Sequence, residues 1–132
     1  MHDFKIIAKE VLELEAKELL NAAALIGDEM REATELVASL KGKLIITGVG
    51  KSGLIGAKIA ATLASTGTSS FFLHPTEALH GDLGMIGKDD AVLAISYSGE
   101  SEELIKILPH IKRFDIPLIG MAKTKNSSLG RY

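Results

Sequence analysis

The stretch Lys43–Gly53, KLIITGVGKSG, decides the fold of this chain. Its apolar run, Leu44–Ile46, is typical of a parallel strand that is buried on both faces. Three glycines then allow a tight turn, and a helical pattern follows directly. A strand, a glycine-rich turn and a helix start together favour an anion site, because the helix N-terminus offers unpaired N–H groups and the positive end of its dipole. Lys51 adds a full positive charge, so phosphate is the expected anion.

Other interpretations of this loop are weaker. A nucleoside-triphosphate P-loop needs a glycine where Ile45 stands. The spacing of the glycines does match G-x-G-x-x-G; they are Gly48, Gly50 and Gly53. A dinucleotide site would also need an acidic residue after the next strand, and that apolar run, 71–73, is followed by His74. The glycines could also serve helix–strand packing alone, but packing gives no reason for Lys51 and Ser52.

The composition is that of one ordinary globular domain. The chain has 132 residues, of which 46% are hydrophobic and 24% charged. Its net charge of −2 gives no indication of binding to nucleic acid or to an anionic membrane. It has no cysteine, which excludes disulfides and thiolate chemistry. No signal peptide or run of about 18 apolar residues is present. We therefore expect a soluble cytoplasmic protein.

Two amphipathic helices are predicted ahead of the central strand. The first spans about 3–26, with Asp3 as its N-cap and Gly27 as its stop, and the second spans about 28–40 and ends at Gly42. The two helices carry more apolar surface than is needed to cover one face of a small sheet. They either pack within the chain or also bury against another subunit, and the pattern slightly favours the second alternative.

The remainder alternates between strands and helices. Helices are predicted at 54–65 and 102–112, a short helix from Pro75 to Gly81, a loop at 81–88, and strands at 69–73, 91–95 and 117–121. The residues of the 102–112 helix expected to face inward are Leu104, Ile107, Leu108 and Ile111. This alternation predicts a parallel α/β sheet with helices on both faces and strand order 2-1-3-4. Asn126–Ser128 resemble a further helix cap.

In such a sheet, ligands bind where the strand order reverses, at the carboxyl ends of the first and third strands. The loops that follow these strands are 48–53 and 96–101, and we expect them to face each other. The second loop supplies three hydroxyls and a glycine; these are Ser96, Ser98, Gly99 and Ser101. Serines also cap helices for purely structural reasons. Opposite Lys51 and Ser52, however, a phosphate cradle is favoured.

Three acids surround the start of the 102–112 helix: Glu100, Glu102 and Glu103. Acids in a first turn complement the helix dipole, which explains one or two of them. Close to a bound phosphate they would repel it. We therefore expect one of them to reach the uncharged end of the ligand as a general base.

The segment His74–Asp82 concentrates His74 and His80 with two acids. It offers three alternatives: a metal site, a histidine that transfers protons, or ordinary hydrogen-bonded loop histidines. No cysteine or second histidine cluster completes a metal site, so no metal is predicted. Proton transfer is the favoured alternative.

Several motifs together resemble the sugar isomerase (SIS) domain. They are GVGKSG at 48–53, ASTGTSSFF at 64–72, His74–Gly84 and Ser96–Ser101. The resemblance is narrower to bacterial D-arabinose 5-phosphate isomerases, which interconvert D-ribulose 5-phosphate and D-arabinose 5-phosphate for the synthesis of Kdo, an acidic sugar of lipopolysaccharide and some capsules. It implies a three-layer α/β sandwich around a five-stranded parallel flavodoxin-like sheet. It also implies a homotetramer, often followed by a pair of CBS domains. A lysine or backbone donors can stabilise the enediol intermediate of such a reaction without metal, so no cofactor is expected.

The resemblance also implies roles for particular residues. The catalytic positions are Lys51, His80 and Glu103, and the substrate-binding positions are Gly48, Gly50, Lys51, Ser52, Ser96, Ser98, Gly99 and Ser101. Tyr97 stands where the family usually has Asn.

The family has a further catalytic glutamate and histidine downstream of Tyr132. We therefore expect residues 1–132 to form one SIS domain that is incomplete at its C-terminus, with a helical hairpin at 1–42, an α/β core at 43–132 and no CBS domains. A non-catalytic sugar-phosphate sensor or regulator is the alternative. Such regulators usually carry a helix-turn-helix, for which residues 1–42 are too short and not basic enough.

Overall fold

The computed structural model describes residues 1–132, which divide into two compact units, residues 1–35 and residues 36–132. The first unit contains α1 (Phe4–Ala24) and the start of α2 (Asp28–Ser39). The Asp3 side chain accepts a hydrogen bond from the Lys5 N–H at 2.9 Å, which confirms it as the N-cap of α1. The helix ends earlier than expected, with Leu25 rather than Gly27 at its C-cap. No residue of α1 is buried.

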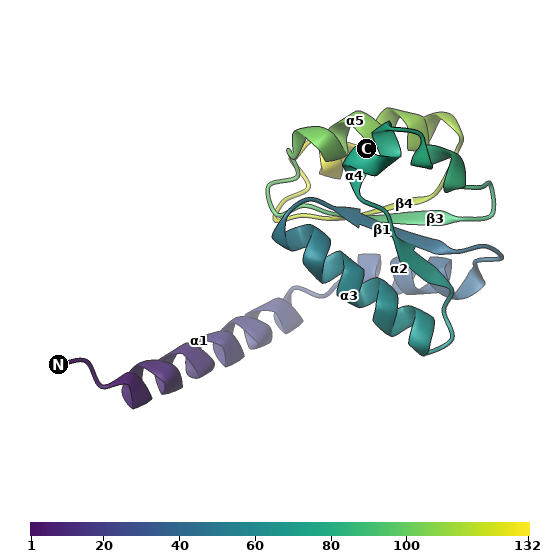
Figure 1. Ribbon diagram of the computed structural model, residues 1–132. Helices are drawn as coiled ribbons and strands as arrows, with labels where there is room; N and C mark the ends of the chain where they lie inside the picture. The colour runs from purple at the N-terminus through teal and green to yellow at the C-terminus, as the bar shows by residue number, and fades with distance from the viewer. The chain divides into compact units, whose positions relative to one another are not determined.

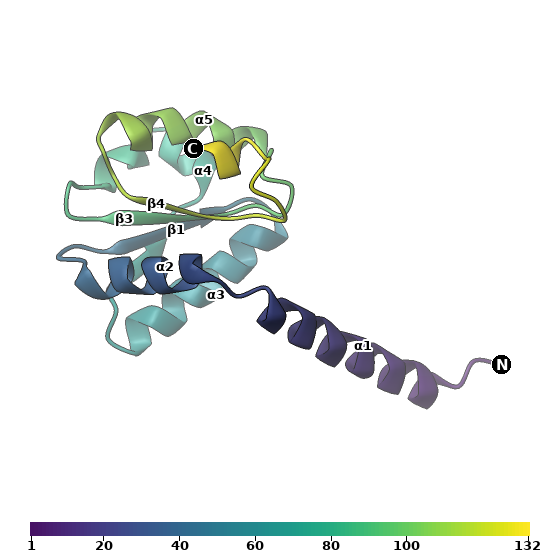
Figure 2. The same cartoon turned by 180° about the vertical axis from the view of Figure 1, so that it is seen from behind.

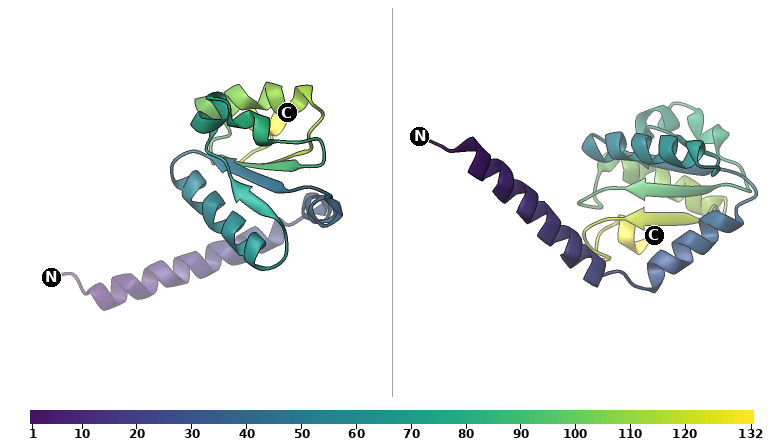
Figure 3. Two further views of the ribbon diagram at one scale, coloured as in Figure 1. Left: turned by 45° about the vertical axis from the view of Figure 1, so that its right-hand side comes forward. Right: turned by 90° about the horizontal axis from the view of Figure 1, so that it is seen from below.

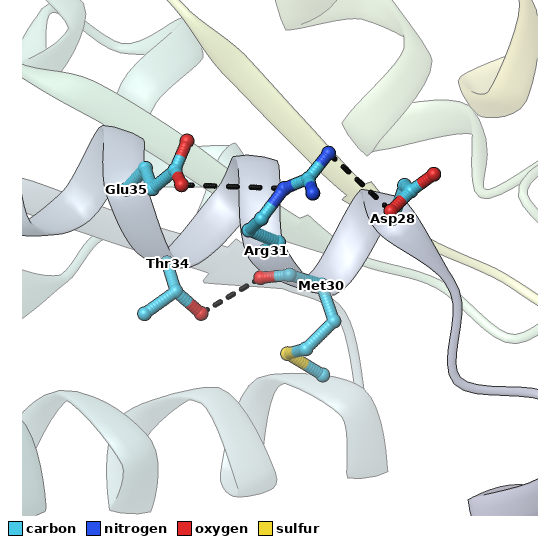
Figure 4. A network of polar contacts seen from close by, with 5 residues as sticks. All are labelled: Asp28, Met30, Arg31, Thr34 and Glu35. Atoms are coloured by element: carbon cyan, nitrogen blue, oxygen red, sulfur yellow. Dashed lines mark hydrogen bonds and ion pairs between the residues drawn. The ribbon is translucent and has the colours of Figure 1, made fainter.

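The first turns of α2 are held by local polar contacts (Figure 4). Arg31 lies 3.3 Å from the carboxylate of Asp28 and 4.0 Å from that of Glu35, and the Thr34 hydroxyl donates to the Met30 carbonyl at 2.7 Å. These charged side chains are exposed, and such pairs stabilise a helix by only about 0.3–0.5 kcal/mol each. These contacts are ordinary interactions within a helix, and they do not indicate a ligand site.

The second unit, residues 36–132, contains the end of α2 and the strands and helices expected at 43–132. Its remaining elements are β1 (Leu44–Gly48), α3 (Lys51–Ser65), β2 (Ser70–Phe72), α4 (Pro75–Leu79), the 3-10 turn η1 (Asp82–Met85), β3 (Ala91–Ile95), α5 (Glu102–Arg113), β4 (Leu118–Met121) and the 3-10 turn η2 (Leu129–Arg131). All strands are parallel in the order β2-β1-β3-β4, which confirms the predicted order. The sheet has four strands, one fewer than the resemblance implies, and the expected loop at 81–88 contains η1.

The sheet lies between two layers of helices, with α4 and α5 on one face and α3 on the other (Figures 1 and 2). Every residue of β1 and β3 is buried, as the continuous apolar runs predict. The α5 face of the sheet packs against the predicted inward set, Leu104, Ile107, Leu108 and Ile111. The opposite face packs against Ala60 of α3 and against Leu36 and Val37. None of the helices combines the length and apolar composition that a membrane crossing requires.

Two glycines of the decisive stretch bring α3 unusually close to β1. A Cβ on Gly53 would lie 2.7 Å from the Gly48 carbonyl oxygen, and one on Gly48 would lie 2.9 Å from the Ile95 carbonyl oxygen. Farther along α3, a Cβ on Gly56 would lie 3.0 Å from Cγ2 of Ile46. The packing interpretation therefore accounts for Gly48 and Gly53, and the turn itself depends on Gly50.

Candidate functional site

The carboxyl ends of β1 and β3 lie side by side, because Gly48 pairs with Ile95 in the sheet register. The chain leaves β1 into α3 and leaves β3 into α5, and these two helices cover opposite faces of the sheet (Figure 3). The loops 49–50 and 96–101 therefore begin next to each other at the point where the strand order reverses. This confirms that the predicted strand order brings the glycine loop and the serine loop to one edge.

The glycine loop leaves the start of α3 open. Gly50, the N-cap of α3, has φ +61°, a conformation that side-chain-bearing residues adopt at a cost, and an added Cβ there would meet no atom within 4 Å. No side chain caps this helix. The first unpaired N–H groups of a 15-residue helix are thus available to an anion. Lys51, the first helical residue, is exposed and makes no ion pair or hydrogen bond within the chain, and Ser52 is half-buried beside it.

The serine loop is folded by its own hydroxyls. Ser96 is only 2% exposed; its Oγ accepts the Gly99 N–H at 3.0 Å and shares a hydrogen bond of 3.0 Å with Ser101 Oγ. Ser98 is exposed, and its Oγ accepts the Glu100 N–H at 3.1 Å, which leaves the O–H group as a donor. Ser96 therefore shapes the loop, whereas Ser98 and Ser101 are better placed to donate to a ligand. As with α3, no side chain caps α5.

The three acids at the start of α5 have different surroundings. Glu100 accepts two hydrogen bonds from Ser128, which lower the pKa of its carboxyl below the ordinary value of 4.5; burial opposes this shift weakly and the charge of Arg131 adds to it. Glu102 pairs with Lys106 at 3.1 Å. Glu103 is exposed and has neither an ion pair nor a hydrogen bond from its side chain. Of the three, Glu103 is the carboxylate left free to act on a ligand.

The two histidines of the 74–82 segment also differ. His74 is the N-cap of α4, where its Nδ1 accepts the Thr76 N–H at 3.1 Å, so this ring has a structural role. His80 is the C-cap of the same helix, and its exposed ring has no partner in the chain. Nowhere in the chain do three histidine, aspartate or glutamate side chains gather in a way that could hold a metal ion. Since α4 packs against α5, His80 lies on the same side of the sheet as Glu103.

Two features of this edge escaped prediction from the sequence. Thr47, the residue of β1 before Gly48, is 1% exposed, and its Oγ1 has no hydrogen-bond partner. The only available signal was a hydroxyl at the end of an apolar run. The second feature is the contact between Glu100 and Ser128, which joins residues 28 positions apart. No local pattern in the sequence indicates such a contact.

A hollow in the α/β unit lies away from these two loops. It has a volume of about 530 Å³ and is lined by Pro109, Lys112, Arg113, Ser128, Arg131 and Tyr132, along the outer side of α5 and η2. Its cations make it a second place where an anion could bind. It therefore provides a specific competitor against which the candidate site can be tested.

Comparison with known proteins relates this geometry to one family. A family model described as SIS domain matches residues 37–132. Arabinose 5-phosphate isomerase KdsD of Pseudomonas aeruginosa is 50% identical over 129 residues, which cover 98% of this chain and 40% of that protein. The protein of the same name from Salmonella typhi is 49% identical, with 98% of this chain and 39% of that protein covered. The chain thus spans about two fifths of the length of these curated relatives.

A solved structure agrees with the sequence comparison. The E. coli CFT073 protein c3406 in complex with arabinose 5-phosphate matches with a TM-score of 0.82 and 40% identity. The match covers 99% of this chain and 71% of that chain.

Proposed function

This chain belongs to the SIS domain family, and from that premise we propose that it carries an aldose–ketose isomerase site that interconverts D-ribulose 5-phosphate and D-arabinose 5-phosphate. The relatives at 49–50% identity bear the name of that activity, and a solved relative is a complex with arabinose 5-phosphate. The single observation that carries the proposal is the meeting of two uncapped helix N-termini with Lys51 at the reversal point of the sheet.

The phosphate group of the substrate binds between the two loops. The first N–H groups of α3 and α5 point to this edge, and the Lys51 ammonium adds a charge that no acid of the chain neutralises. Ser52, Ser98 and Ser101 supply hydroxyl donors. Gly50 leaves the glycine loop open, because an added Cβ there would meet no atom within 4 Å, while Ser96 holds the serine loop in shape.

The reaction moves a proton between two neighbouring carbons. A base removes the C2 proton of the aldose, and the C1 carbonyl oxygen takes up a proton to become a hydroxyl in the enediol. A proton is then returned to C1 while the 2-hydroxyl loses its own proton, which leaves the carbonyl at C2. Glu103 lies about half a turn beyond Ser101, so its carboxylate reaches past the phosphate toward these carbons; it is the proposed base. His80 relays protons or assists ring opening. Hydrogen-bond donors stabilise the enediol oxygen, and the chemistry requires no cofactor.

Proton exchange tests this assignment. The native protein, incubated with D-arabinose 5-phosphate in deuterium oxide, is expected to form D-ribulose 5-phosphate with deuterium at the exchanged carbon. Glu103→Gln is expected to keep substrate affinity and to lose about 10²–10⁴ in turnover. The matched control is Glu102→Gln, which removes the same charge from a side chain already paired with Lys106. Wild-type exchange in Glu103→Gln would eliminate Glu103 as the base. Binding without turnover in the native protein would favour a non-catalytic sugar-phosphate-binding module.

We further propose that the protein is a cytoplasmic homotetramer that serves Kdo synthesis for lipopolysaccharide or capsule. The many exposed apolar side chains of α1 support assembly, since an isolated helix with that surface is expected to bury it against other chains. Kdo synthesis would need the D-arabinose 5-phosphate made by this reaction. Sedimentation at micromolar concentration tests the assembly, and a stable monomer would contradict it.

A further inference from the structure

The serine loop is clasped by the segment that follows β4. Residues 123–129, here called the clasp, make two backbone hydrogen bonds to the loop: the Lys123 N–H donates to the Tyr97 carbonyl and the Leu129 N–H to the Gly99 carbonyl, both at 3.0 Å. Gly99 has φ +70°, and a Cβ there would collide with the Ser127 side chain. The conformation of the serine loop therefore depends on where the clasp lies.

One side chain ties the two segments together. Both carboxylate oxygens of Glu100 are used by Ser128: Oε1 accepts the backbone N–H at 2.7 Å and Oε2 accepts the hydroxyl at 2.5 Å. Hydrogen bonds to an ionised carboxylate are among the stronger ones in proteins, and a bidentate pair also fixes direction. The clasp is itself ordered, since the Ser127 hydroxyl donates to the Thr124 carbonyl and accepts the Gly130 N–H, each at 3.0 Å.

The contact between Glu100 and Ser128 affects the hydrogen-bond donors of the serine loop that would bind a phosphate. The backbone N–H of Glu100 donates to Ser98 Oγ, so holding Glu100 also sets the direction of the Ser98 hydroxyl. Ser101, the next residue, is the N-cap of α5 and shares a hydrogen bond with Ser96. A loop that lost its tie to Ser128 would present these donors in several arrangements, and an ordering cost would be added to every binding event.

We propose that Glu100 is a positioning residue of the sugar-phosphate site: by holding Ser128 it fixes the serine loop in the conformation that receives the phosphate. This inference rests on the proposed function and adds to it a residue that does not touch the substrate. It also explains why an acid stands beside an anion site, because the carboxylate is engaged on the clasp side of the loop.

Whether Glu100→Gln weakens or tightens the binding of D-arabinose 5-phosphate distinguishes a positioning role of Glu100 from a purely electrostatic effect of its charge. If Glu100 were only a negative charge near the phosphate, Glu100→Gln would remove repulsion and tighten the binding of D-arabinose 5-phosphate. If Glu100 positions the loop, the same change weakens binding, by about tenfold for one lost charge-assisted pair. Ser128→Ala changes no charge and is expected to weaken binding in the same direction. Glu102→Gln, the charge-matched control, is expected to stay within about twofold of wild type.

Calorimetry on the native protein and these variants measures the affinities, and hydrogen exchange without ligand measures the order of the loop. The Gly99 and Leu129 amides, which donate within the serine loop and from the clasp to it, are expected to exchange faster in Glu100→Gln than in Glu102→Gln. Glu100→Gln combined with Ser128→Ala is expected to cost little more than either change alone, because both weaken the same contact between residues 100 and 128.

Unchanged or tighter binding in Glu100→Gln, or fully additive losses in the double variant, would overturn the positioning role and leave the proposed function intact. Failure of the wild-type protein to bind D-arabinose 5-phosphate would overturn both. If the wild-type protein binds without isomerising, the catalytic proposal fails, and the affinities still decide the role of Glu100.

Discussion

Replacing Thr47 by valine is expected to stabilise this protein. The Thr47 side chain is 1% exposed in β1, and its hydroxyl has no hydrogen-bond partner. An unsatisfied buried hydroxyl costs about 1–3 kcal/mol, and a methyl group in its place adds about 0.8 kcal/mol of apolar burial. Valine has nearly the same shape and suits a strand. After allowance for imperfect packing, we expect Thr47→Val to raise the free energy of unfolding by about 1–2 kcal/mol.

The matched comparison is Ser70→Ala in β2. The Ser70 hydroxyl donates to the Ala60 carbonyl at 2.9 Å. Because Ser70→Ala removes this hydrogen bond, it is expected to lower the free energy of unfolding by about 1 kcal/mol. Denaturant unfolding measures both free energies of unfolding. One fixed protein concentration is used, so that any contribution of assembly to stability cancels in the comparison. A Thr47→Val protein less stable than wild type would contradict this expectation, because it would mean that the Thr47 hydroxyl has a hydrogen-bond partner in solution, for example a bound water.

Three further predictions follow from the site and the first unit. Lys51→Ala is expected to lose about 10- to 100-fold in calorimetric affinity for D-arabinose 5-phosphate, whereas Lys58→Ala, an exposed lysine farther along α3, stays near wild type. The hydrogen bonds from Ser128 lower the pKa of Glu100, so the ionised carboxylate stabilises the fold fully at pH values above the ordinary glutamate pKa, and this stabilisation is lost as the pH falls through the lower pKa of the folded state. Glu100→Gln is therefore expected to reduce the free energy of unfolding in neutral solution and to change it little in strong acid. An equal reduction at neutral and acid pH would contradict this dependence. Leu19 of α1 is 72% exposed, and Leu19→Lys is expected to dissociate the proposed tetramer in sedimentation, with unchanged assembly as the contrary result.

The sheet was predictable because its signals are local. The apolar runs of β1 and β3 are bounded by glycine and serine loops, and β3 and the start of α2 were predicted at their observed residues. Strand order followed from the rules for parallel crossovers. The short turn η1 was missed because it lies in a glycine-punctuated segment with no clear period. The end of α1 was set by Leu25 rather than by the glycine nearby.

The juxtaposition of the glycine loop and the serine loop was predictable, but the surroundings of their side chains were not. The sequence places hydroxyls at 96, 98 and 101 but cannot tell that Ser96 is buried and bonded to Ser101. It also places three acids together, and only the tertiary structure separates Glu100, held by Ser128, from Glu103, which is free. These distinctions depend on contacts between segments, which a single sequence does not encode in any local pattern.

The proposed phosphate site is tested most directly by titrating the isotope-labelled protein with D-arabinose 5-phosphate and following the chemical shifts of its backbone amides. We expect the largest changes at Lys51 and Ser52 and in the serine loop from Ser98 to Ser101, and we expect them to saturate together with one dissociation constant. Changes confined to the hollow lined by Lys112, Arg113 and Arg131, or no change in either loop at saturating ligand, would rule out a phosphate site between the two loops.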